Sequence, residues 1–158
     1  TIENVRCTYA DGRYLVVWTQ VELGERSLLA RQINPGNGSV GGLKTVASSN
    51  VGVWASTKLG NNNFVAWEDS SDSTIRIVRL DKAGDLLDGP NTLGVMPGAG
   101  AAMDATALAG VVVVAWADGN GDVSAVRIKT DFQALKTVQA VRPSVSRLHW
   151  FAGKSMRT

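Results

Sequence analysis

Short apolar runs of about five to seven residues alternate along the chain with segments rich in Gly, Asn, Asp and Ser. Val, Ile, Trp, Tyr and Thr dominate these runs, and such residues favour the pleated surface of a β-strand. The pattern predicts an all-β protein with twelve strands. They are expected near residues 4–9, 13–19, 27–33, 42–47, 51–58, 63–68, 74–80, 91–96, 101–108, 111–117, 123–128 and 134–140.

Two segments, 21–31 and 131–141, also fit a helix. In the second, Asp131 would cap a run that has Phe132, Leu135 and Val138 at helical spacing. Against this helix, Leu-Lys-Thr-Val at 135–138 repeats Leu-Lys-Thr-Val at 43–46, which lies between Gly-rich turns and is predicted to be a strand.

The chain contains an internal repeat. Three similar apolar runs end in Trp18, Trp67 and Trp116, at intervals of 49 residues. The following apolar runs carry Arg31, Arg79 and Arg127, at intervals of 48 residues. Two markers with nearly the same period indicate units of four strands each, at about 1–49, 50–98 and 99–141, and residues 142–158 are predicted to begin a fourth unit.

Four strands in about fifty residues is typical of a β-propeller blade, and each blade covers its apolar faces by stacking on its neighbours. The form Gly-x-aromatic-apolar-Val-x-Trp occurs in Asp11-Gly-Arg-Tyr-Leu-Val-Val-Trp18, and a turn-forming Asp81-Lys-Ala-Gly84-Asp-Leu-Leu-Asp88 follows the Arg-containing strand of the second unit. These features resemble the blade repeat of secreted bacterial β-propeller proteins. The resemblance covers nearly the whole chain and implies a single propeller segment over residues 1–158, located outside the cell or at its surface.

Such propellers include lectin-like binders, surface adhesins and scaffolds, so the resemblance favours an architecture more than a function. Closed propellers have about four to eight blades, and three units would leave two sheets unpaired. We therefore expect completion by more of the same polypeptide, by a second copy in a homo-oligomer, or by another subunit. The alternative is a compact arrangement of three units.

Composition and charge exclude several classes of protein. A formal net charge of +2 is too small for a dedicated nucleic-acid binder, and the seven basic residues of 123–158 are spread out and most simply balance an acidic body. No apolar stretch is long enough for a membrane span. A single Cys and a single His exclude a disulfide framework, a multi-cysteine zinc site and a His-rich metal site.

The only cofactor candidate is calcium. Asp118, Asn120 and Asp122 place oxygen-bearing side chains at alternate positions, as calcium loops do. However, Val123 and Lys129 stand where an EF-hand needs its Gly and its bidentate Glu. The same residues form a good hairpin turn, and this interpretation is favoured.

Tryptophans give the weak ligand-binding candidates. Trp18, Trp67 and Trp116 are expected to pack between blades because they repeat. Trp54 and Trp150 lie outside that register, on the predicted first strands of their units, and an exposed indole there would stack on a sugar. Core packing of Trp54 and Trp150 remains the favoured alternative.

No catalytic residue is assigned. Cys7 and His149 are expected to be a buried thiol and an exposed imidazole rather than a catalytic pair. The carboxylates that a glycosidase would need lie mostly at turn positions: Asp69, Asp72, Asp81, Asp85, Asp88, Asp104 and Asp118. The leading hypothesis is a non-enzymatic module that binds a glycan or a surface partner. An assembly subunit is the alternative, and a glycosidase-like enzyme is the least favoured.

Overall fold

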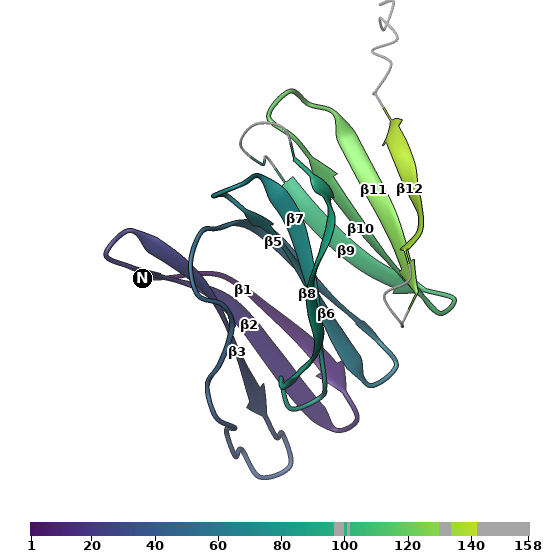
Figure 1. Cartoon of the computed structure of the whole chain (residues 1–158). Coiled ribbons are helices and arrows are strands. Elements are labelled where there is room, and N and C mark those ends of the chain that lie inside the picture. Colours follow the sequence, from purple (N-terminus) through teal and green to yellow (C-terminus); the bar gives the residue numbers. More distant parts are fainter. Residues whose placement is uncertain (97–99, 101, 130–133, 142–158) are drawn as a thin grey trace, which may run out of the picture.

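The computed structural model describes residues 1–96, 100, 102–129 and 134–141, which form twelve strands and no helix. The strands make three antiparallel sheets of four strands, and in each sheet the strands are neighbours in chain order (Figure 1). The first sheet contains β1 (Ile2–Ala10), β2 (Arg13–Glu22), β3 (Glu25–Ile33) and β4 (Lys44–Ala47). The second contains β5 (Val51–Leu59), β6 (Asn62–Asp69), β7 (Thr74–Leu80) and β8 (Leu86–Val95). The third contains β9 (Ala102–Leu108), β10 (Val111–Ala117), β11 (Val123–Lys129) and β12 (Ala134–Val141).

The prediction of an all-β protein is confirmed, and a strand occurs at each of the twelve expected places. The helical alternatives are wrong for 21–31 and for 134–141. Residues 21–31 form a hairpin in which β2 and β3 pair without interruption from Tyr14 opposite Ile33 to Glu22 opposite Glu25. This ladder satisfies the backbone groups that a helix would have satisfied internally. Asp131 and the predicted fourth unit at 142–158 lie outside the described residues.

The three sheets stack face to face, and two apolar layers separate them (Figure 1). The layer between the first and second sheets contains Leu15, Val17, Leu28, Ala30, Val51, Trp54, Val65, Trp67, Val78 and Leu80. The layer between the second and third sheets contains Ala55, Phe64, Ala66, Ile75, Ile77, Met96, Met103, Val112, Val114, Trp116, Val126 and Ile128. The second sheet is therefore covered on both faces, which explains why residues 63–68 of β6 are all buried. Within the described residues the sheets form no closed barrel or ring.

Strand register places two of the marker tryptophans in equivalent positions. Trp67 pairs with Trp54, and Trp116 pairs with Met103. Both indoles are buried, at 3% and 4% exposure, and each faces the preceding sheet. The prediction that these two tryptophans pack between sheets is confirmed.

Trp18 differs, because no sheet among the described residues covers it. Leu15, Val17 and Thr19 of β2 are buried on the side of the second sheet, so the intervening Trp18 points the other way. It is half-buried on the outer side of the first sheet. The packing of Trp18 between sheets therefore stays a prediction.

Only two of the three repeated arginines occupy equivalent positions in their sheets. Arg79 and Arg127 pair with Phe64 and Val113, which are 49 residues apart. Arg31 instead pairs with Val16, so it lies on the opposite side of its sheet. The constant interval of 48 residues therefore does not give three equivalent arginines.

Cys7 is exposed, and the prediction of a buried thiol is wrong. It pairs with Val16 and so shares the uncovered side of the first sheet with Trp18. Partial burial by its neighbours still raises the pKa of the Cys7 thiol.

Candidate functional site

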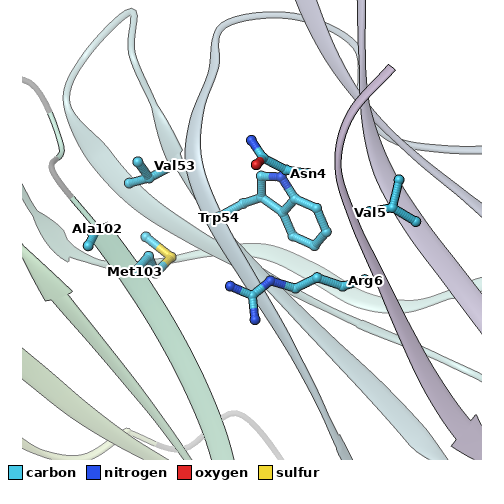
Figure 2. Close-up of a pocket in the computed structure, with 7 residues that line it drawn as sticks. All are labelled: Asn4, Val5, Arg6, Val53, Trp54, Ala102 and Met103. Carbon is cyan, nitrogen blue, oxygen red and sulfur yellow. The ribbon is translucent and has the colours of Figure 1, made fainter.

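A cavity of about 500 Å³ lies where the first strands of the three sheets approach one another. Strand β5 is adjacent to both β1 and β9. Figure 2 shows the seven residues that line the cavity: Asn4, Val5, Arg6, Val53, Trp54, Ala102 and Met103. Each sheet contributes to this cavity, so the stacking of sheets creates it.

Trp54 is the central side chain of this cavity. It is only 4% exposed, and its indole Nε1 donates a hydrogen bond of 2.7 Å to Oγ1 of Thr19. The indole is therefore not openly exposed, and its burial agrees with core packing, which the sequence favoured. Ligand binding by Trp54 stays a prediction.

Arg6 extends across the Trp54 ring (Figure 2). Its guanidinium carbon is 5.8 Å from the ring centroid, which is within cation–π range. Its Nη1 is 3.8 Å from a carboxylate oxygen of Asp104 on β9. Both side chains of this ion pair are largely solvent-accessible, so the pairing is weak and its partner is replaceable. Trp54 thus supports a cation that faces the cavity.

Asn4 supplies a second polar group beside Arg6. Its φ of 49° lies in the left-handed region, which Asn tolerates better than most residues. The pairing of β1 with β2 shifts register between Glu3 and Arg6, which marks a β-bulge around Asn4. Bulges redirect side chains, and here Val5 points away from Trp54 while Asn4 lies near it (Figure 2).

A second cavity, of about 560 Å³, contains a buried carboxylate. Glu68 of β6 is 5% exposed, and its oxygens accept long hydrogen bonds from the backbone N–H groups of Gly100, at 3.3 Å, and Val53, at 3.5 Å. A Cβ on Gly52 or on Gly100 would overlap the carboxylate, so these glycines make room for it.

The Asp118 loop is a hydrogen-bonded turn. Oδ1 of Asp118 accepts hydrogen bonds from the N–H groups of Asn120, at 2.9 Å, and Asp122, at 3.0 Å. The Asp81 loop repeats this geometry, since Oδ1 of Asp81 accepts from Ala83 and Asp85, both at 2.8 Å. A hairpin turn therefore explains the spacing of Asp118, Asn120 and Asp122, and this is the interpretation that the sequence favoured over a calcium loop. Among the described residues no group of three or more His, Cys, Asp or Glu side chains is placed to hold a metal ion.

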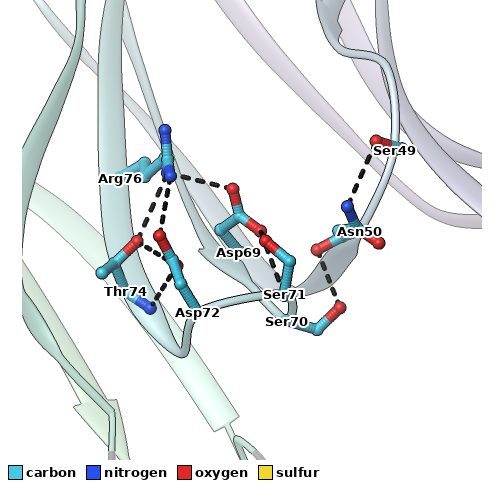
Figure 3. A network of polar contacts seen from close by, with 8 residues as sticks. All are labelled: Ser49, Asn50, Asp69, Ser70, Ser71, Asp72, Thr74 and Arg76. Atoms are coloured by element: carbon cyan, nitrogen blue, oxygen red, sulfur yellow. Dashed lines mark hydrogen bonds and ion pairs between the residues drawn. The ribbon is translucent and has the colours of Figure 1, made fainter.

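A polar network joins the β6–β7 turn to the start of β5 (Figure 3). Arg76 forms ion pairs with Asp69, at 3.0 Å, and Asp72, at 2.9 Å. Hydrogen bonds from the Thr74 hydroxyl and N–H, and the Arg76 guanidinium, lower the pKa of Asp72. Both carboxylates are therefore held in structural contacts.

The other carboxylates considered for glycoside hydrolysis pair with basic side chains or close turns. Lys44 pairs with Asp85, Arg79 with Asp88 and Arg6 with Asp104. Asp81 and Asp118 close turns, as described above. This distribution gives the glycosidase hypothesis no support from the described residues.

The sequence did not single out Arg6, Asn4 or Glu68. None of them belongs to the repeated pattern, and only the stacking of the first sheet on the second brings Arg6 to Trp54. Trp150 and His149 lie outside the described residues, so the structure does not place them.

Comparison with protein-family models finds no match, and comparison with curated proteins finds none either. The described residues include no helix long and apolar enough to cross a membrane.

Proposed function

We propose that this protein is a non-enzymatic, lectin-like module that binds an acidic carbohydrate in the cavity between β1, β5 and β9. The observation that carries the proposal is the guanidinium of Arg6, held over Trp54 at a cavity to which all three sheets contribute. The volume of about 500 Å³ falls within the range of small-molecule sites, roughly 300–1,000 Å³.

The chemistry of the lining suits a sugar that carries a carboxylate. A guanidinium presents a planar set of donors that matches a carboxylate, and the exposed, weakly held Asp104 would yield to a ligand. The Asn4 amide offers a donor and an acceptor for hydroxyl groups. Val53, Ala102 and Met103 provide an apolar wall for the C–H face of a sugar ring.

The finer architecture belongs to the same proposal: the three sheets are blades of a β-propeller. Support comes from the four-stranded meander order, the face-to-face stacking and the 49-residue register of Trp67 and Trp116. In this arrangement the first strands line the centre, where the cavity lies. By resemblance to secreted propellers, we also propose that the protein acts outside the cell or at its surface.

Calorimetric titration with glucuronate, with glucose as the neutral comparison, tests the binding function. We expect glucuronate to bind more tightly than glucose, because only glucuronate pairs with Arg6. Arg6→Gln should weaken glucuronate binding about 10- to 100-fold, since a charge-assisted pair contributes about 1.5–3 kcal/mol.

The matched control is Arg13→Gln, which removes an arginine at the β1–β2 turn, outside the cavity lining. It should leave the affinity for glucuronate unchanged. Equal affinities of the wild type and Arg6→Gln, or no preference for glucuronate over glucose, would contradict the proposal.

A second candidate function, a subunit of a larger assembly, is favoured by a different observation. The outer side of the first sheet carries Trp18 in a position whose equivalents in the other two sheets are covered.

A further inference from the structure

Among the described residues, no sheet covers the outer side of the first sheet or the outer side of the third sheet. On the first sheet, the side that carries Trp18 is called the back face, and it comprises Cys7, Tyr9, Tyr14, Val16 and Trp18. On the third sheet, the opposite side is called the front face, and it comprises Val113, Ala115, Ala117, Val123 and Ala125. The front-face residues alternate with Val112, Val114 and Trp116, which are buried against the second sheet.

The two interfaces between sheets inside the chain have the same orientation. In each, the Trp-bearing side of one sheet packs on the other side of the preceding sheet. The Trp116 ring lies against β8, because a Cβ on Gly94 would be 3.3 Å from its Cζ2. Gly94 pairs with Ile75, and Ala47 pairs with Leu28 at the corresponding place in the first sheet. Small residues thus receive the bulky side of the next sheet.

The front face of the third sheet continues this pattern. In register, Val113, Ala115 and Ala117 occupy the places of Phe64, Ala66 and Glu68 in the second sheet. Val123 corresponds to Ile75, which is fully buried, yet Val123 is 38% exposed. The front face of the third sheet is therefore the register equivalent of the side of the second sheet that receives Trp116.

The back face of the first sheet is the complementary surface. Trp18 corresponds to Trp67 and Trp116, and Val16 corresponds to Val65 and Val114. The four equivalents in the second and third sheets are buried. Tyr9 and Tyr14 pack with ring centroids 5.0 Å apart while both remain exposed. Exposed apolar side chains that lie next to one another are typical of interaction sites.

We infer that a second copy of this chain covers both faces, with the front face of each copy packed on the back face of the other. This inference rests on the proposal that the sheets are propeller blades. Two copies supply six sheets, which is within the range of about four to eight for closed propellers. Contact between two back faces alone would leave both front faces uncovered, whereas head-to-tail contact covers all four faces and closes the ring.

The native mass of the particle is the first test. At micromolar concentration the wild type should have twice the chain mass of 16.7 kDa. Trp18→Asp on the back face and Ala115→Arg on the front face should each reduce the particle to one chain. Leu23→Asp, at an exposed turn outside both faces, is the matched control and should leave the mass at two chains.

Mixing the two variants distinguishes head-to-tail contact from symmetric contact. Trp18→Asp keeps an intact front face, and Ala115→Arg keeps an intact back face. The mixture should therefore form a heterodimer through one intact interface, weaker than the wild-type dimer. Circular dichroism of each variant establishes that its sheets remain folded.

Cys7 gives a readout that needs no variant, because it lies on the back face. Its rate of labelling by a thiol reagent should fall about tenfold where nine-tenths of the chains are paired, by mass action. In Trp18→Asp the rate should not depend on chain concentration.

Three results would overturn the inference: a single-chain particle at every concentration, a dimer that neither variant disrupts, or Cys7 labelling that is independent of concentration in the wild type. A particle that gains mass only with a different protein would overturn it too. Glucuronate titration of Trp18→Asp tests the binding function separately, since Trp18 lies outside the cavity lining, whereas Ala115 lies opposite Asp104, the partner of Arg6.

Discussion

At the scale of residues, Asp118 and Asp81 stabilise two loops in the same way. Each carboxylate accepts hydrogen bonds from two backbone N–H groups of its own turn. Asn34 accepts the N–H of Gly36 at 2.9 Å through its amide oxygen, so a neutral side chain serves in a third loop. The function of these residues is to close turns.

We therefore expect Asp118→Ala to lower the free energy of unfolding by about 1–2 kcal/mol, because two turn hydrogen bonds are lost. Asp118→Asn should cost less than half as much, since the amide oxygen still accepts. Urea unfolding of both variants measures the difference. An Asn variant as unstable as the Ala variant, together with stabilisation of the wild type by calcium, would show instead that the charge at Asp118 is needed.

The contacts at the cavity could not be predicted from the sequence. A tryptophan outside the repeat register drew attention to Trp54, but its burial depends on Thr19 in another sheet. Arg6 carries no local signal, because its contact with Trp54 exists only after two sheets stack. Cys7 was expected to be buried because free cysteines usually are, yet it lies on the one side of the first sheet that nothing among the described residues covers.

At the scale of elements, the three marker tryptophans differ in how much burial they contribute. Trp67→Ala and Trp116→Ala should each lower the free energy of unfolding by about 3–5 kcal/mol, as for other large aromatic side chains in cores. Trp18→Ala should cost less than half as much at concentrations where the chain is monomeric, because its indole is half-buried. Denaturant unfolding at low chain concentration measures all three.

The comparison is informative because the three side chains are identical and their strands are equivalent. A Trp18→Ala variant as unstable as the other two, in a particle of one chain, would mean that something already covers the back face. Equal costs would also contradict the assignment of this face as a docking surface.

The strands themselves were largely predictable. Apolar runs bounded by Gly, Asn and Asp placed all twelve, because β-branched and aromatic residues report a pleated, half-buried surface. The interval between tryptophans predicted equivalent positions correctly for register, while the arginine interval did not. Arg31 faces the side opposite to that of Arg79 and Arg127, because a shift of one residue along a strand reverses the side.

At the scale of the whole molecule, the stacking of sheets could not be derived from one chain's pattern. Periodicity reports which side of a strand is apolar, but not which sheet covers it. The end sheets keep the same pattern as the central one, so only the number of repeats, which predicted two unpaired sheets, indicated that an end sheet would lack a cover among the described residues.

A polar contact between the first and second sheets makes the stability of the fold depend on pH. Lys82, in the β7–β8 turn, binds the carboxylate of Asp11 at the β1–β2 turn at 2.6 Å and so links the second sheet to the first. This hydrogen bond and the charge of Lys82 lower the pKa of Asp11. The unfolded chain therefore binds a proton at higher pH than the folded chain does.

The stability contributed by Asp11 is thus fully present above the ordinary carboxyl pKa of 3.8 and is lost as pH falls through the lower folded value. Lys82→Met should make the melting temperature fall less steeply between pH 5 and roughly pH 3, because the cause of the shift is gone. Lys129→Met, on the third sheet, should keep the wild-type slope. Parallel slopes for the wild type and Lys82→Met would show that the link between the two turns does not couple protonation to the stacking of the sheets.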